Sequence, residues 1–158
     1  MTMRSDIIKL CGKPVVGIEL GVAEGVFSQQ VLQHQAVAEW YAVDMWAGDR
    51  GHGMAQFHSA SKKIEPFPQA TVIRSKFADV VDRFEDEYFD FVFFDAHLTE
   101  EQLFFELSAW YPKIKTGGLV IGHDWHMPET SSAVFKFRDM NNITNRLSSY
   151  DCTFIWKK

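Results

Sequence analysis

Residues 15–28 have the sequence VVGIELGVAEGVFS, an apolar run that ends at Glu19 and Gly21 and continues through Gly25 into a segment with helical spacing. Glycine permits close approach of the backbone, and the start of a helix presents unpaired N–H groups to a ligand. The dinucleotide-binding motif G-x-G-x-x-G needs a glycine where this chain has Ala23, so that motif is absent. The stretch therefore predicts a strand, a glycine turn and a helix, with a ligand beside the turn.

Four more apolar runs follow along the chain, and segments with helical spacing separate them. The five expected strands are Val15–Leu20, Trp40–Asp44, Thr71–Arg74, Phe89–Asp95 and Leu119–His123. Expected helices begin near Val26, cover 77–84, begin at Thr99 and cover Ser131–Met140, and two strands that pair antiparallel are expected at Ile143–Leu147 and Cys152–Trp156. Strands that alternate with helices are typical of a parallel sheet with crossover helices. The order predicts the α/β class, with a Rossmann-like doubly wound seven-stranded sheet that is mostly parallel and has an antiparallel last strand.

The chain has 158 residues, with 16 Lys and Arg against 21 Asp and Glu, which gives a formal net charge of −5. A chain of this length closes one core, so residues 1–158 are expected to form a single domain. The 15% aromatic content excludes disorder as the main state, and the mild acidity argues against binding to a nucleic-acid backbone. Because no export signal and no apolar stretch of roughly 20 residues is present, we expect a cytoplasmic protein that does not contact a membrane.

Carboxylates stand at the ends of four of the five expected parallel strands. The residues at the five strand ends are Glu19, Asp44, Ser75, Asp95 and the pair His123 and Asp124. In a doubly wound sheet, ligands bind beyond the carboxyl ends of the strands. Acids gathered in one crevice repel one another and must lose water, so we expect a ligand that is cationic or rich in hydroxyls. Asp44 stands where a carboxylate can accept both hydroxyls of a ribose.

Four blocks of sequence together resemble a known family. They are ExGxxxGxxS at 19–28, YAVDxWxGD at 41–49, FDFVFFDA at 89–96 and KxGGLVIGHD at 115–124. In this order they look like the class I methyltransferases that use S-adenosylmethionine, and they are most similar to the small group that methylates hydroxyls and often carries a divalent metal. The resemblance runs from about Val15 to Lys158. It implies transfer of a methyl group from S-adenosylmethionine to an acceptor, with a hydroxyl oxygen as the favoured acceptor.

The resemblance also implies how the cofactor is held. Gly21 would pack near the methionine part, Asp44 would take the ribose hydroxyls, and the turn 75–78 would lie near adenine. Glu19 would fix the glycine turn or the amino group, although bracing of the turn is an equally good role for Glu19 and Ser28. The expected cofactor-binding residues are Glu19, Gly21, Gly25, Ser28, Asp44, Met45, Ser75, Lys76, Phe77 and Asp95.

A hydroxyl that accepts a methyl group must lose its proton, through a base or through a metal that lowers its pKa. We expect Asp95, His97 and Asp124 to lie nearest the chemistry, with an ordinary strand-end histidine as the alternative for His97. The resemblance implies that Asp95, His123 and Asp124 hold a divalent metal, Mg²⁺ or a similar ion, in members that have one. The chain departs from the family twice: Leu98 stands where a histidine is usual, and His123 stands where an acid is common.

Three other functions compete with methyl transfer. A metallophosphoesterase would need a G-D-x-x-D block between residues 95–97 and 122–124, and the chain has none there. Hydride transfer with NAD is disfavoured by the missing glycine at position 23. A catalytically silent nucleotide-binding or interaction module stays open.

The acceptor itself is not identified by the sequence, but its covering can be predicted. The chain offers few residues for a cap before the first strand, so we expect a roof from another source. The candidates are the glycine loop Ala47–Gly53 together with His126–Thr130, a second subunit in a homodimer, or a large acceptor.

Overall fold

The computed structural model of the protein describes residues 4–48 and 51–158. The strands are β1 (Val15–Leu20), β2 (Val37–Asp44), β3 (Ala70–Arg74), β4 (Phe89–Phe94), β5 (Ile114–Gly122), β6 (Ser148–Tyr150) and β7 (Thr153–Lys157). The α-helices are α1 (Val26–His34), α2 (Met54–Ile64), α3 (Glu100–Trp110) and α4 (Pro128–Met140), and the 3-10 helices are η1 (Arg4–Cys11), η3 (Phe77–Asp79), η4 (Val81–Arg83) and η5 (Tyr111–Lys113). None of the helices in the described part of the chain is both long and apolar enough to cross a membrane.

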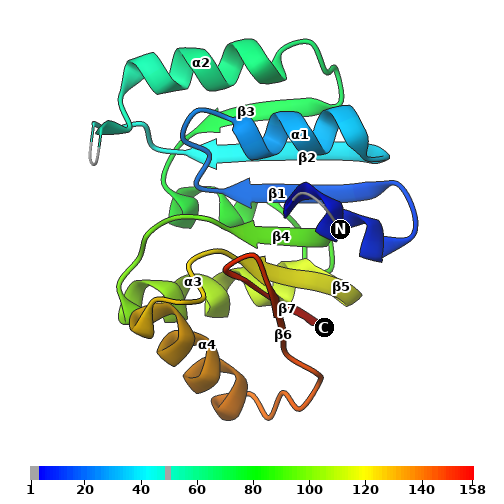
Figure 1. The fold of residues 1–158 in the computed structure, drawn as a ribbon, viewed down its shortest axis with the longest axis vertical. Coiled ribbons are helices and arrows are strands. Elements are labelled where there is room, and N and C mark those ends of the chain that lie inside the picture. The colour runs from blue at the N-terminus through cyan, green and yellow to red at the C-terminus, as the bar shows by residue number, and fades with distance from the viewer. Residues whose placement is uncertain (1–3, 49–50) are drawn as a thin grey trace.

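The strands form one seven-stranded sheet with the order β3-β2-β1-β4-β5-β7-β6. Strands β1 to β5 pair in parallel, whereas β7 is antiparallel to both of its neighbours, β5 and β6. Figure 1 shows the arrowheads of β1, β2, β3 and β4 at the same edge. The predicted doubly wound sheet with an antiparallel last strand is confirmed.

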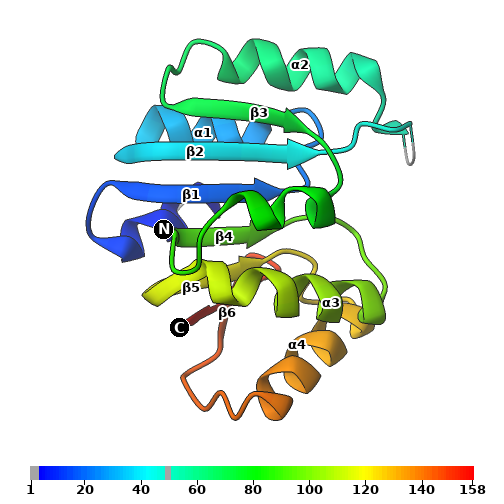
Figure 2. The same cartoon turned by 180° about the vertical axis from the view of Figure 1, so that it is seen from behind.

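Helices cover both faces of the sheet (Figures 1 and 2). The α1 and η1 helices lie on one face, and α3 lies on the other with η3 and η4. The ring of Phe27 from α1 packs 4.3 Å from that of Phe93, whereas Trp110 of α3 belongs to the same buried cluster as Val92. The strand β4 is buried along its whole length, and Asp95, the residue that follows it, stands at the carboxyl edge of the sheet.

The predicted helix over 77–84 is wrong, because two 3-10 helices, η3 and η4, occupy this segment. Both kinds of helix repeat after three to four residues, and Val80 and Val81 are buried in either case. Apolar spacing alone therefore did not distinguish one α-helix from two short 3-10 turns.

The predicted strand over Ile143–Leu147 is also wrong, because β6 begins only at Ser148. The N–H group of Ile143 donates to the carbonyl of Arg138 at 2.9 Å, so the chain still turns away from the end of α4. The side-chain amide of Asn145 donates to the carbonyl of Lys157 at 2.8 Å, beyond the β6–β7 ladder. Hydrogen bonds of the turn after α4 therefore keep residues 143–147 out of the sheet, and β6 begins only after them.

The predicted start of α3 at Thr99 is confirmed. Thr99 Oγ1 accepts a hydrogen bond from the N–H group of Gln102 at 3.2 Å, and Gln102 Oε1 accepts one from the N–H group of Thr99 at 3.0 Å. This reciprocal cap fixes where the helix begins after the chain leaves β4.

Candidate functional site

A cleft of about 500 Å³ opens at the carboxyl edge of the parallel strands. Its walls come from the turn after β1, the segments after β2 and β3, the chain beyond β4 and β5, and one side of α3. The lining residues that the sequence predicted are Gly21, Asp44, Met45, Lys76, Phe77, Asp95, His97 and Asp124. The fold thus brings together most of the expected cofactor residues and all three expected catalytic residues.

Two glycines of the turn are required by close packing. Gly21 has φ of +100°, and a Cβ atom there would lie 2.5 Å from the carbonyl oxygen of Asp95. Gly25 has φ of +77°, and a Cβ atom there would lie 2.9 Å from Cα of Ala60 in α2. Gly21 therefore lets the turn approach the end of β4, while Gly25 lets α1 approach α2 without lining the cleft.

Asp44 braces the glycine turn. Its Oδ2 atom accepts hydrogen bonds from the N–H groups of Val22 at 2.9 Å and Ala23 at 3.0 Å, and its Oδ1 atom accepts one from Trp46 at 3.0 Å. Ala23 has φ of +50°, a left-handed conformation that glycine adopts more readily. A carboxylate has about four lone-pair sites, so one site of Asp44 is left for a ligand in the cleft.

Glu19 and Ser28 form a buried pair beneath the turn and do not line this cleft. Ser28 Oγ donates to Glu19 Oε2 and accepts a hydrogen bond from Trp40 Nε1 at 2.8 Å. Glu19 is only 1% exposed. Burial raises the pKa of its carboxyl well above the ordinary value of 4.5, and the hydrogen bond from Ser28 only partly opposes this.

We expect Glu19→Gln to remove a pH dependence of stability. Since the folded state holds the Glu19 proton to a higher pH than the unfolded chain, the unfolding free energy of the parent falls as pH rises from about 4.5 toward the raised pKa. The variant has no such proton, so its unfolding free energy relative to the parent should rise with pH, by at most about 1.4 kcal/mol per pH unit. Denaturant unfolding between pH 4 and pH 8 measures this, with the exposed Glu24→Gln as the control. Parallel pH profiles of parent and Glu19→Gln would contradict the prediction.

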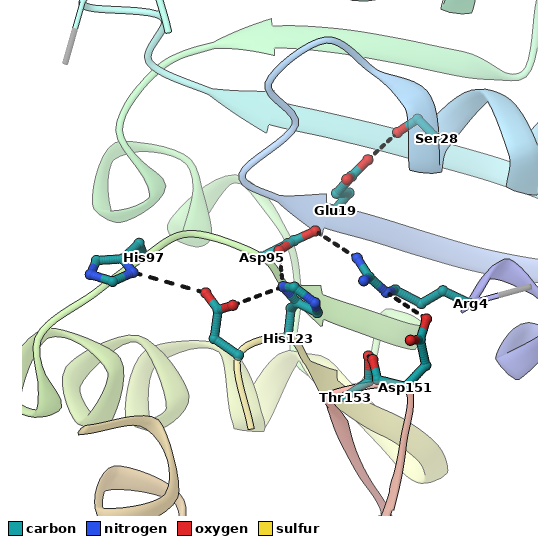
Figure 3. A network of polar contacts seen from close by, with 9 residues as sticks. Arg4, Glu19, Ser28, Asp95, His97, His123, Asp151 and Thr153 are labelled. Carbon is teal, nitrogen blue, oxygen red and sulfur yellow. Dashed lines mark hydrogen bonds and ion pairs between the residues drawn. The ribbon is translucent and has the colours of Figure 1, made fainter. Parts of the chain in front are cut away.

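A chain of polar contacts links the cleft residues Asp95, His97 and Asp124 to His123 and Arg4 (Figure 3). His123 Nδ1 lies 3.3 Å from Asp95 Oδ1 and 3.0 Å from Asp124 Oδ1. Asp124 Oδ2 faces His97 Nδ1 at 4.0 Å, and Asp95 Oδ2 faces Arg4 Nη1 at 3.8 Å. Burial raises the pKa of the Asp95 carboxyl above 3.8, against the lowering effect of His123 and Arg4. Asp124 has φ of +59°, a strained conformation that turns the chain directly after β5.

The arrangement of these groups does not suit Mg²⁺. In the described part of the chain, no three His, Cys, Asp or Glu side chains are grouped so that they could hold a metal. His123 Nδ1 stands between the carboxylates of Asp95 and Asp124, and its nitrogen is a poor partner for Mg²⁺, which prefers oxygen ligands. A metal at Asp95, His123 and Asp124 stays a prediction from the resemblance, and we derive no catalytic step through it.

Some cleft residues were missed, and some predicted residues lie elsewhere. Gln102 and Glu106 of α3 line the cleft, and their four-residue spacing on one helix face was the available signal. Burial raises the pKa of the Glu106 carboxyl, which accepts a hydrogen bond from Trp110 Nε1 at 3.1 Å. Ser75 lies outside the cleft wall, and its N–H group donates to the carbonyl of Asp44 at 2.9 Å.

The structure describes residues 47–48 and 51–53 of the predicted covering loop. His52 lines the cleft, and its carbonyl accepts a hydrogen bond from the N–H group of Gly48 at 3.0 Å. Asp49 and Arg50 lie outside the described residues. Residues 126–130 lead into the first turn of α4 and do not line the cleft, so closure by Ala47–Gly53 and His126–Thr130 stays a prediction.

Comparison with known proteins adds a family match. The sequence model of a family described as a methyltransferase domain matches residues 18–125. A curated protein of Sinorhizobium fredii, the uncharacterized protein y4gI, is 23% identical over 126 residues. That alignment covers 77% of the present chain but only 14% of the relative, so the chain spans about one seventh of that protein's length.

Solved structures share the fold at low sequence identity. The O-methyltransferase NovP superposes with a TM-score of 0.74 and 19% identity, over 98% of this chain and 79% of that one. An O-methyltransferase from Bacillus cereus in complex with SAH superposes with a TM-score of 0.69 and 13% identity, over 98% of this chain and 78% of that one. A putative caffeoyl-CoA O-methyltransferase from Staphylococcus aureus superposes with a TM-score of 0.64 and 16% identity, over 96% of this chain and 78% of that one. At these identities the likeness shows the fold alone.

Proposed function

The chain belongs to the methyltransferase-domain family, and we propose that it transfers a methyl group from S-adenosylmethionine to a hydroxyl oxygen of an acceptor. The observation that carries this proposal is the cleft in which Gly21, Asp44 and Asp95 meet from the ends of β1, β2 and β4. A glycine turn before a helix, with an acid at the end of the next strand, suits a ligand that contains adenosine. The O-methyltransferases of similar fold support an oxygen acceptor.

The wall of the cleft suits the adenosine half of the cofactor. Phe77, Ala78 and Leu98 offer apolar surface for a flat ring, and Gln102 adds an amide at its edge. The remaining lone-pair site on Asp44 can accept a ribose hydroxyl. The half-buried carboxylate of Asp95 favours a nearby sulfonium cation by charge.

Calorimetric titration with S-adenosylhomocysteine tests the cofactor. We expect one binding site per chain, and absence of binding would favour a silent interaction module instead. The acceptor class is tested with methyl-labelled S-adenosylmethionine and a panel of phenols, catechols and sugars beside amines and thiols of similar size. We expect label on oxygen, and a product labelled on nitrogen or sulfur would overturn that part of the proposal.

The reaction is an in-line displacement at the sulfonium methyl carbon. The acceptor oxygen forms a bond to that carbon, the carbon–sulfur bond breaks, and sulfur keeps the electron pair. The chain's role is to align oxygen and carbon, exclude water and take the hydroxyl proton. His97 lines the cleft, 49% of its side chain is exposed, and Asp124 faces the Nδ1 atom of His97. We therefore assign to the His97 imidazole the role of the base that takes the hydroxyl proton.

We expect His97→Gln to lower kcat about 100-fold, because positioned general bases contribute roughly that much or more. Titration with S-adenosylhomocysteine should give an unchanged affinity, since His97 is assigned to the acceptor and not to the cofactor. Turnover is followed with the hydroxyl compound that gives product in the panel. His34→Gln, at an exposed histidine that ends α1 and lines neither cleft, is the matched control and should keep the parent kcat. Equal losses in both variants would remove His97 from this role.

A further inference from the structure

A second cleft, of about 540 Å³, adjoins the first. Its lining residues are Arg4, Glu19, Val22, Ala23, Glu24, Val26, Phe27, Gln30, Gln56, Asp95 and Asp151. Among the described residues that line the two clefts, Asp95 is common to both, and Gly21 of the first is followed directly by Val22 of the second. The two clefts are therefore neighbours at Asp95 and the glycine turn.

Arg4 of η1 lies in the wall of the second cleft with unused hydrogen-bond donors. Its guanidinium is 3.8 Å from Asp95 Oδ2 and 3.8 Å from Asp151 Oδ2, distances too long for hydrogen bonds (Figure 3). Its Nε atom is buried and has no hydrogen-bond partner within the described residues. A guanidinium has five N–H donors in a planar fork, so this one is poised to bind a carboxylate through two hydrogen bonds.

A second polar group in this cleft, the side-chain carbonyl of Gln56, can also accept a hydrogen bond from a ligand. Gln56 Oε1 of α2 is buried and accepts no hydrogen bond within the part of the chain that the structure describes. Together, the Arg4 fork, the Gln56 carbonyl and the Asp95 carboxylate offer donors for a carboxylate and acceptors for an ammonium group. This set is complementary to an α-amino-acid zwitterion, whose charged groups would otherwise lose water without compensation.

We propose that Arg4 binds the α-carboxylate of the methionine chain of S-adenosylmethionine in the second cleft, while adenosine lies in the first. The proposal rests on the proposed function and names a binding residue for it that the sequence did not reveal. On binding, Arg4 exchanges its long ion pairs with Asp95 and Asp151 for a bidentate pair with the ligand. Gln56 and Asp95 accept hydrogen bonds from the α-ammonium group, and the sulfonium lies at the junction of the clefts.

The test compares two ligands that differ in the amino-acid part. S-adenosylhomocysteine carries the carboxylate and ammonium, whereas 5′-methylthioadenosine has the adenosine and sulfur without them. Both are titrated into the parent protein and into Arg4→Gln, Arg4→Lys and Arg83→Gln. We expect Arg4→Gln to weaken S-adenosylhomocysteine at least tenfold and to change 5′-methylthioadenosine less than twofold. Arg4→Lys, which keeps the charge but not the fork, should be intermediate.

Arg83→Gln is the matched control, because it removes an exposed arginine that lines neither cleft. It should leave the affinity for S-adenosylhomocysteine within twofold of the parent. Equal weakening of both ligands by Arg4→Gln would mean that Arg4 only holds η1 in place and would overturn the proposal. Unchanged affinity for S-adenosylhomocysteine would also overturn it, and would point to Lys76 in the first cleft. A parent protein that binds neither ligand would instead overturn the proposed function.

Discussion

Gly21→Ala is expected to destabilise the protein by about 3 kcal/mol or more and to weaken S-adenosylhomocysteine at least 100-fold. A side chain at φ of +100° costs about 1–3 kcal/mol in backbone strain. The added methyl group would also stand 2.5 Å from the carbonyl oxygen of Asp95 and 2.8 Å from the backbone nitrogen of Ala96, and neither is the flexible end of a side chain. The turn must therefore move away from β4, and the junction of the two clefts moves with it.

Gly117→Ala separates backbone strain from close approach in this experiment. Gly117 has φ of +83°, but a Cβ atom there would meet nothing within 4 Å. We expect a loss of about 1 kcal/mol in unfolding free energy and no change in affinity. Denaturant unfolding and calorimetric titration of both variants give the comparison. If Gly21→Ala behaves like Gly117→Ala, the packing of the turn against Asp95 does not matter for the site.

Asp44→Ala is expected to cost about 3 kcal/mol of stability and roughly 100-fold in affinity for S-adenosylhomocysteine. The change leaves the N–H groups of Val22, Ala23 and Trp46 without their acceptor, at about 1–3 kcal/mol for each donor that water cannot reach. It also leaves Ala23 in a left-handed conformation without the hydrogen bond that its N–H group donates to Asp44. The expected loss of affinity has two sources: the contact between Asp44 and the ribose is lost, and the glycine turn is no longer held in place.

A ligand comparison separates these two contributions of Asp44. Asp44→Asn keeps one acceptor oxygen, so part of the bracing of the turn should survive. In the parent, adenosine should bind about tenfold more tightly than 2′,3′-dideoxyadenosine, because only adenosine has ribose hydroxyls for the remaining lone-pair site. In Asp44→Asn that preference should shrink. An undiminished preference would assign the ribose to another residue and leave Asp44 as a brace only.

Local patterns predicted much of the site because they depend on neighbouring residues. An apolar run followed by Gly21 predicts a strand and a close turn wherever the strand lies, and the carboxylates of Asp44 and Asp95 mark strand ends in the same way. The start of α3 at Thr99 was predictable for the same reason, since its cap is formed within four residues.

The features that the sequence did not predict correctly share one physical cause. Whether residues 77–84 form one α-helix or two 3-10 turns depends on how Val80 and Val81 reach the core, which spacing does not encode. The role of Ser28 as partner of a buried Glu19 depends on Trp40 in the neighbouring strand. In each case the deciding contact comes from tertiary packing.

The sequence by itself determined the doubly wound sheet, the glycine turn and the acids at the strand ends, because each follows from periodicity or from the conformational range of a residue type. Only the tertiary structure decided what these groups contact. It turned the Asp44 carboxylate toward the backbone of the turn, placed Gln102 and Glu106 in the cleft wall and brought Arg4 to Asp95 across 91 positions of the chain. Such contacts join residues that are distant in sequence, and their geometry is fixed only when the sheet and helices pack together.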